Sequence, residues 1–195
     1  MAAQVAPAVI GWLWLAFVVC WLVLALFNKK ANRGARWSGW GARLAIAAGV
    51  VLVTWLQRHG AAGPEDSIGR ALTLHVGAAG QWLGVALCGA GFALAFWARA
   101  HLGRNWGMPM SLRQGHELVT SGPYAYVRHP IYTGIMLAMI GSALAVAFLW
   151  LALFALYFAY FLFSARTEEK MMLTQFPAAY PAYRRRTKML LPFLL

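Results

Sequence analysis

The sequence predicts an all-α, polytopic integral membrane protein with about five transmembrane helices. Hydrophobic side chains make up 62% of the chain and charged side chains only 11%, which leaves too little polar surface for a water-soluble domain. Several uncharged apolar runs approach the length of about 20 residues that crosses a bilayer. All 195 residues are therefore expected to form a single membrane domain.

The N-terminal half, residues 1–99, is expected to hold three spans. The first covers roughly Val9–Phe27, the second Gly41–Leu56 and the third Ala71–Ala98, which is long enough to tilt. Because no basic residues precede the first run, we interpret it as a retained helix rather than a cleaved signal peptide.

The apolar run Ile131–Phe163 is too long for one ordinary span. Two helices that meet near Gly141–Ala147 would account for it. With five crossings and the N-terminus outside, every Lys and Arg except Arg58 and Arg70 lies on the cytoplasmic side, as the positive-inside rule requires. A single fourth crossing would instead place the basic C-terminal tail outside, so the charge distribution favours a C-terminal helical pair.

The segment after Phe163 should continue the fifth span into the cytoplasm as an amphipathic helix. Its apolar residues Leu173 and Phe176 are expected on one face, and Pro177 and Pro181 are expected to end the helix. The apolar end of the chain should return to the membrane surface.

The net charge of +12 does not indicate nucleic-acid binding. The basic residues stand at the ends of apolar segments, where they orient a membrane protein. No Cys or His cluster has the spacing of metal ligands, and His75, within the third span, is more typical of a histidine hydrogen-bonded inside the bundle. No Gly-rich strand-to-helix fingerprint of a dinucleotide site is present.

A polar, turn-rich segment, residues 115–134, precedes the C-terminal pair. Gly122-Pro123 forces a turn within it. Backbone donors at a helix start beside aromatic side chains suit a nucleotide-like ligand, although Arg128-His129-Pro130 would equally suit an ordinary helix start at a membrane surface. The aromatic side chains around this turn are Tyr124, Tyr126 and Tyr132.

Three of the five acidic residues, Glu117, Glu168 and Glu169, fall on the predicted cytoplasmic side. The adjacent pair Glu168-Glu169 suits a solvated helix end whose charges balance nearby Lys and Arg residues. It equally suits a receptor for a cationic ligand group such as an amine. The residues alone leave both interpretations open.

At these residues the chain resembles the isoprenylcysteine carboxyl methyltransferase family, whose relatives include membrane phospholipid methyltransferases. The resemblance implies a membrane methyltransferase that uses S-adenosylmethionine, with a cofactor pocket on the cytosolic side of the C-terminal helical pair. Residues 100–195 would then form the cofactor-binding, catalytic half. The features that match, in family order and spacing, are residues 116–134, Arg166–Glu169, Tyr180, Tyr183 and residues 191–193.

The resemblance also implies roles for single residues. Arg166 and Glu169 are expected to be catalytic, with Arg166 handling the acceptor. The Glu168-Glu169 pair is expected to bind the amino-acid end of the cofactor. The other cofactor-binding positions that the resemblance implies are His116, Glu117, Leu118, Val119, Tyr124, His129, Pro130, Ile131 and Tyr132.

Two departures from the family pattern concern the acceptor. Lys170 follows the second glutamate, where eukaryotic members have a longer acidic run, and residues 176–180 read Phe-Pro-Ala-Ala-Tyr instead of Phe-Gly-x-Glu-Tyr. We expect a lipophilic small molecule or lipid-modified acceptor that bears a carboxylate, with a lipid amine or a small thiol left open. Membrane lipid is the other expected partner, the oligomeric state is left open, and the Ala- and Trp-rich chain suggests a bacterial inner membrane.

Two other functions fit parts of the sequence. An NADPH-dependent sterol-type reductase has a similar C-terminal architecture and would use Arg184, Arg185 and Arg186 for the 2′-phosphate, but the glutamate pair argues against it. A small transporter or accessory subunit predicts polar residues near the bilayer midplane, where the spans offer mainly His75 and Gln81.

Overall fold

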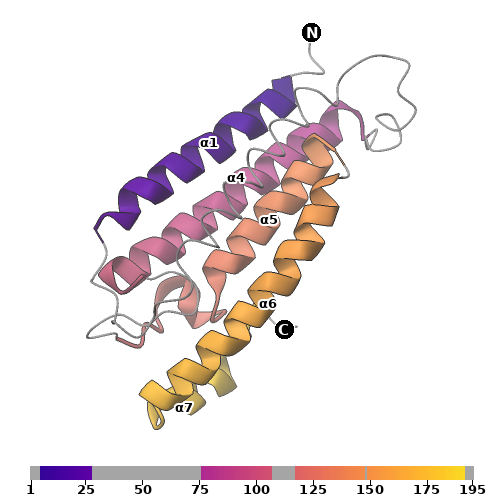
Figure 1. Ribbon diagram of the computed structural model, residues 1–195. Helices are drawn as coiled ribbons and strands as arrows, with labels where there is room; N and C mark the ends of the chain where they lie inside the picture. Colours follow the sequence, from indigo (N-terminus) through magenta and orange to yellow (C-terminus); the bar gives the residue numbers. More distant parts are fainter. Residues whose placement is uncertain (1–4, 28–75, 107–116, 148, 192–195) are drawn as a thin grey trace.

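A computed structural model describes residues 5–27, 76–106, 117–147 and 149–191 (Figure 1). Within these ranges every regular element is a helix, which confirms the predicted all-α class. The elements are α1 (Val5–Ala25), α4 (Gly77–Leu102), the short 3-10 helices η2 (Gly103–Asn105) and η3 (Gly122–Ala125), α5 (Pro130–Ala145), α6 (Leu149–Gln175) and α7 (Ala179–Arg186).

Three of these helices, α1, α4 and α6, are long and apolar enough to cross a membrane. They correspond to the first, third and fifth predicted spans, so the chain is a multi-pass membrane protein. The apolar helix α5 has 16 residues and is about 24 Å long. The predicted second span, Gly41–Leu56, lies outside the described residues.

The predicted C-terminal pair forms as expected. Helix α5 ends at Ala145, α6 begins at Leu149, and α6 continues beyond its apolar part to Gln175. Pro177 follows the end of α6 closely, as predicted. Pro181 was expected to help end this helix, but it lies in the first turn of α7, where its missing N–H is tolerated.

Helices α4 and α5 run antiparallel with their backbones in close contact. Gly84 faces Gly141, and Gly91 faces Gly134 about two turns farther along each helix. A Cβ atom on Gly84, Gly134 or Gly141 would lie 2.5 Å from a backbone oxygen of the opposite helix. Small residues at matching positions allow membrane helices to approach this closely.

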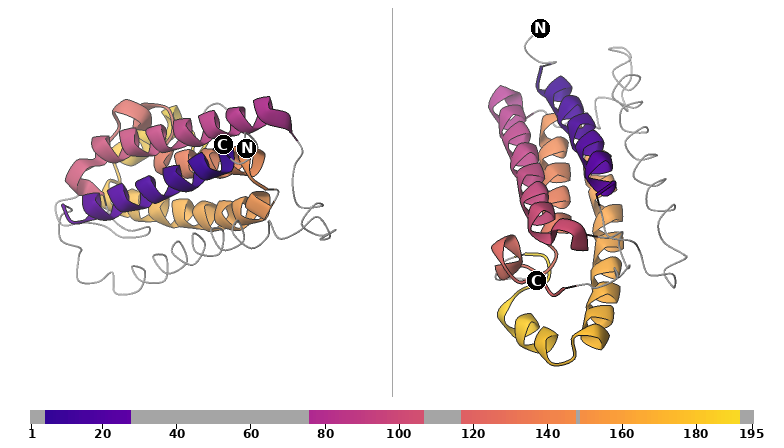
Figure 2. Two further views of the ribbon diagram at one scale, coloured as in Figure 1. Left: turned by 90° about the horizontal axis from the view of Figure 1, so that it is seen from above. Right: turned by 90° about the vertical axis from the view of Figure 1, so that its left-hand side faces the viewer.

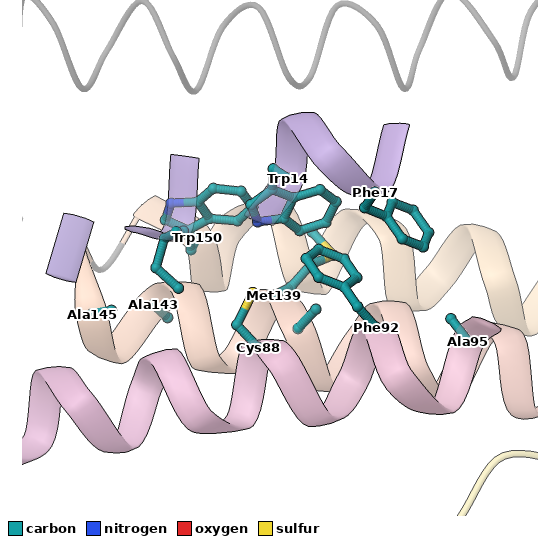
Figure 3. Packing of buried hydrophobic residues seen from close by; sticks show 11 residues of the cluster. Trp14, Phe17, Cys88, Phe92, Ala95, Met139, Ala143, Ala145 and Trp150 are labelled. Carbon is teal, nitrogen blue, oxygen red and sulfur yellow. The ribbon is translucent and has the colours of Figure 1, made fainter. Parts of the chain in front are cut away.

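Aromatic side chains fill the core between α1, α4, α5 and α6 (Figure 3). Trp14 of α1 stacks on Trp150 of α6 with ring centroids 5.2 Å apart, and Phe17 stacks on Phe92 at 4.4 Å. The Trp14 indole N–H donates to the hydroxyl of Ser142 at 3.0 Å, and that hydroxyl donates to a backbone carbonyl within α5. This arrangement gives hydrogen-bond partners to the Trp14 indole and the Ser142 hydroxyl inside the core.

The elements that carry the predicted site meet at one end of the bundle (Figures 1 and 2). Arg99, in the last turn of α4, donates to the carbonyl of Leu24 at 2.9 Å and thereby ties the ends of α4 and α1 together. Gly122 begins η3 with a φ of 59° and lies directly against the imidazole of His101. The positive φ and this close approach both favour glycine at that position.

Candidate functional site

The turn before α5 is held by the chain that follows α7. The backbone N–H groups of Arg128 and His129 donate to the carbonyl oxygens of Lys188 and Met189 at 2.8 and 3.1 Å. The hydroxyl of Thr133, in the first turn of α5, donates to the backbone carbonyl of the residue after Met189 at 2.5 Å. The C-terminal segment therefore fixes the backbone from which the His129 side chain projects.

Both adjacent glutamates of α6 reach this turn. The Tyr132 hydroxyl donates to Glu168 Oε1 at 2.5 Å, and His129 Nδ1 lies 3.4 Å from Glu168 Oε2. His129 Nε2 lies 3.7 Å from Glu169 Oε1. The turn and the glutamate pair thus belong to one site. We term it the glutamate cluster, formed by Arg128, His129, Tyr132, Glu168, Glu169 and Arg184.

Glu169 is the more enclosed of the two carboxylates. Its side chain is 5% exposed, Arg128 Nε donates to its Oε1 at 2.6 Å, and Arg184 Nε lies 3.4 Å from its Oε2. A buried charge needs such partners because desolvation of an unpaired carboxylate is costly. The side chain of Glu168 is 25% exposed, so Glu168 is the carboxylate with room for a ligand.

The imidazole of His129 lies between the two carboxylates. Burial on its own would lower the pKa of His129, but attraction to Glu168 and Glu169 outweighs burial and holds this pKa above its usual value. The buried Nε2 atom has no hydrogen-bond partner among the residues that the structure describes. It offers a donor to a polar ligand group.

Aromatic and apolar side chains support the cluster from the membrane side. The rings of His129 and Tyr132 are nearly parallel, at 4° and 5.5 Å, and Tyr132 stacks on Phe161 of α6 at 4.5 Å. Ile131 packs against the same hydrophobic group, and the buried Pro130 begins α5. This stacking orients the Tyr132 hydroxyl toward Glu168.

Tyr124 connects η3 to α7. The hydroxyl of Tyr183 donates to the backbone carbonyl of Tyr124 at 2.7 Å, and both side chains are buried. Burial raises the pKa of Tyr183 to about 12 and holds that of Tyr124 well above its usual value. Both phenols are therefore neutral at physiological pH and can serve as hydrogen-bond donors rather than as bases.

The first predicted cofactor positions precede η3 in the chain. Glu117 is exposed, and Leu118 and Val119 are half-buried, in the segment that leads into η3. The hydrogen bonds and ion pairs given above join none of these three residues to the glutamate cluster. His116 lies outside the described residues. Their cofactor-binding roles stay predictions.

Arg166 is exposed on α6. It shares an exposed stripe of the helix with Phe163 and Lys170, which lie about one turn before and after it. The structure therefore places Arg166 beside the glutamate cluster along the helix, with its side chain on the outer face. Its role toward an acceptor stays a prediction, as does the catalytic role of Glu169.

Two members of the cluster, Arg128 and Arg184, were not predicted as site residues. The sequence position of Arg128 is that of any basic residue at the start of a membrane helix. Arg184 belongs to a run of three arginines that is typical of a cytoplasmic tail. Only the adjacency of Arg128 to His129 in the motif could have indicated a role in the site.

Parts of the chain are similar to several curated proteins. The chain is 37% identical over 99 residues to the cobalt-zinc-cadmium resistance protein CzcN of Cupriavidus metallidurans, covering 49% of this chain and 45% of that protein. It is 35% identical over 99 residues to the nickel-cobalt-cadmium resistance protein NccN of Alcaligenes xylosoxydans xylosoxydans, covering 49% and 46%. It is 38% identical over 82 residues to the protein-S-isoprenylcysteine O-methyltransferase of Schizosaccharomyces pombe, covering 40% and 34%. The chain thus spans about half or less of the length of these relatives.

The names of two of these relatives refer to metals. In the parts of the chain that the structure describes, no group of three or more His, Cys, Asp or Glu side chains is placed to hold a metal ion. Cys88 is buried and Cys20 exposed, and both are free thiols.

The family comparison covers the site itself. Residues 82–174 match the model of the isoprenylcysteine carboxyl methyltransferase (ICMT) family. The matched segment contains most of α4, the turn before α5, all of α5 and the glutamate pair of α6, and therefore every member of the glutamate cluster except Arg184. This segment is just under half of the chain, and through it the chain is similar to the isoprenylcysteine carboxyl methyltransferase family.

Proposed function

We propose that this chain is a membrane methyltransferase that uses S-adenosylmethionine and transfers its methyl group to the carboxylate of a lipophilic acceptor. One observation carries the proposal: His129 and Tyr132 meet Glu168 and Glu169 in a single cluster, within the segment that matches the ICMT family. The family supplies the class of reaction. The cluster supplies groups suited to binding the methyl donor.

The chemistry of the cluster fits this donor, which carries an ammonium group, a carboxylate and a sulfonium. The partly exposed carboxylate of Glu168 would bind the ammonium group. The guanidinium of Arg184, whose side chain is 52% exposed, would bind the carboxylate, with the buried Nε2 of His129, which makes no hydrogen bond within the described residues, as a second donor. His129 contacts Glu168, and both His129 and Arg184 contact Glu169, so the three groups adjoin one another around one carboxylate.

The bound donor supplies a methyl group attached to a positively charged sulfur. A carboxylate oxygen of the acceptor bonds to the methyl carbon while the carbon–sulfur bond breaks, which gives a methyl ester and a neutral thioether without any proton transfer. Carboxylates are already ionised at neutral pH, so no side chain needs to act as a general base. The contribution of the chain is to position the two reactants and exclude water.

The depth of the cluster supports a lipophilic acceptor. Residues 149–165 of α6 carry no charge and are about 26 Å long, close to the hydrocarbon thickness of about 30 Å. Arg166, Glu168 and Glu169 follow immediately, so the cluster lies at the level of the lipid headgroups. A water-soluble donor and a membrane-embedded acceptor can meet there, and the exposed Arg166 is placed to bind an acceptor carboxylate.

The direct test is incubation of the purified protein with labelled methyl donor and a lipid extract of the host membrane. We expect the label in a lipid-soluble product that loses it in mild base, as a methyl ester does. A label that is stable to base would still support methyl transfer, but it would exclude a carboxylate as the acceptor. Absence of transfer together with absence of donor binding in calorimetry would reject the function.

A second candidate, an NADPH-dependent membrane reductase, is favoured by one specific feature. A hollow of about 380 Å³, lined by Arg128 and residues 184–189, adjoins the cluster, and we term it the basic hollow. Guanidinium groups of this kind bind phosphate well. Thermal-shift measurements with NADPH and with S-adenosylmethionine separate the candidates, because only the true cofactor should raise the unfolding temperature.

A further inference from the structure

The basic hollow lies between α7 and the turn before α5. Arg184, Arg185, Arg186 and Lys188, four of its lining residues, are exposed. The loop from α7 back toward α5, visible in Figure 2, forms the wall that carries Lys188 and Met189. The hollow is thus a feature of the folded C-terminal segment and is distinct from the glutamate cluster, with which it shares only Arg128 and Arg184.

Positive charge in the basic hollow exceeds the negative charge beside it. Glu169 forms ion pairs with Arg128 and Arg184. The hollow carries three further positive charges, those of Arg185, Arg186 and Lys188. Such a lining repels a ligand with ammonium and sulfonium groups and attracts an anion. Because guanidinium groups form paired hydrogen bonds with phosphate oxygens, a phosphate group is the chemistry that fits.

The position of the hollow along the membrane normal indicates the source of the phosphate. Arg184 reaches Glu169, which stands about 6 Å along the helix beyond Ala165, the last residue of the uncharged part of α6. The polar layer on each side of a bilayer is about 5–7 Å thick. Met189 lines the hollow and the exposed Leu191 follows it, so apolar side chains adjoin the cations.

We propose that the basic hollow binds the phosphate of an anionic membrane phospholipid. Arg185, Arg186 and Lys188 hold the headgroup phosphate, while Met189 and Leu191 lie beside the glycerol and the start of the acyl chains. Since Arg184 contacts Glu169 and also lines the hollow, a bound lipid holds α7 against the glutamate cluster. The proposal does not depend on which reaction the cluster performs.

The test compares three double variants with the wild-type protein in lipid nanodiscs or mixed micelles. Arg185→Gln/Arg186→Gln removes two charges from the hollow, Arg185→Lys/Arg186→Lys keeps them, and Lys29→Gln/Lys30→Gln removes two charges from another predicted cytoplasmic segment. Bound phosphatidylglycerol and phosphatidylcholine are measured by native mass spectrometry.

We expect the wild type, the lysine variant and the Lys29/Lys30 control to bind phosphatidylglycerol in preference to phosphatidylcholine. The Arg185→Gln/Arg186→Gln variant should bind phosphatidylglycerol about tenfold more weakly. Equal affinity in this variant and the wild type would overturn the proposal, and so would an equal loss in the Lys29/Lys30 control. Unchanged thermal unfolding of the variants shows that folding does not cause the loss.

Competition experiments identify the source of the phosphate. Inorganic phosphate and NADPH, at the concentration of the lipid, are expected to leave phosphatidylglycerol bound. Displacement by inorganic phosphate would assign the hollow to a free anion, and displacement by NADPH would assign it to a nucleotide; either result overturns the lipid assignment. Calorimetry with the methyl donor is performed separately, so a failure of the proposed methyltransferase function is distinguishable from a failure of lipid binding.

Discussion

Arg128 and Glu169 form a buried ion pair, with 2.6 Å between Nε and Oε1, that joins the turn before α5 to the C-terminal part of α6. Their side chains are 8% and 5% exposed. The guanidinium of Arg128 also donates to the backbone carbonyls of Arg184 and Thr187. The Arg128 side chain therefore connects the turn before α5, the C-terminal part of α6 and the end of α7, and the position of each segment depends on it.

Removal of the arginine alone should destabilise the protein strongly. Arg128→Met leaves the Glu169 carboxylate buried without its closest positively charged partner, and such a loss typically costs about 3–5 kcal/mol of unfolding free energy. Arg128→Met/Glu169→Leu removes both charges and should recover most of this loss. Chemical unfolding in detergent measures both variants; a double variant less stable than the single one would show that the pair itself provides the stability.

The two glutamates should respond differently to loss of charge. Glu168→Gln should weaken binding of the methyl donor about tenfold because a charged hydrogen bond is lost, and it should lower stability less than Glu169→Gln because Glu168 is partly exposed. Glu169→Gln should weaken both binding and stability, since Arg128 and Arg184 lose their partner. Calorimetry and thermal unfolding on the same preparations check this. Equal donor affinity for both variants and the wild type would exclude the pair from the donor site.

The stability of the protein should fall as the pH rises above neutrality. The pKa of His129 in the folded protein is raised above its unfolded value of about 6.5, so its attraction to Glu168 and Glu169 is fully present below that value. The stabilisation is then lost as the pH rises through the raised pKa. His129→Gln should flatten this dependence in thermal unfolding between pH 6 and pH 9. A slope that is the same in the variant would assign the effect to another group.

Hydrophobicity and charge were sufficient to predict the spans formed by α1, α4 and α6 and the break between α5 and α6, because both properties are local in sequence. The meeting of His129 with Glu168 followed from the family resemblance. The roles of Arg128 and Arg184 were not predicted, because they depend on α7 and the residues after it folding back against the turn before α5, and this contact leaves no periodic signal. Pro181 was misassigned because a proline that ends one helix and a proline that begins the next look alike in sequence.

The glycines of α4 offer a matched test of helix packing. Gly91→Ala introduces a methyl group against the backbone of Gly134 and Ala138, and we expect a loss of about 1–3 kcal/mol of stability. Gly89→Ala makes the same chemical change two residues away, where a Cβ atom meets nothing within 4 Å. It should be neutral, or stabilising by up to about 1 kcal/mol through helix propensity. Equal unfolding temperatures for the two variants would contradict the close contact of α4 with α5.

Arg166 and Lys170 provide a final pair of variants, because both are exposed on the same stripe of α6 and only Arg166 is assigned to the acceptor. Arg166→Ala should lower kcat/KM for the acceptor about 10- to 100-fold through loss of a charged, paired hydrogen bond, while affinity for the methyl donor stays unchanged. Lys170→Ala should leave both quantities near their wild-type values. A loss of donor affinity in Arg166→Ala without a change in turnover would move this arginine from the acceptor to the donor. The two roles are separable because Arg166 is exposed on the outer face of α6, whereas Glu168 contacts the turn that carries His129.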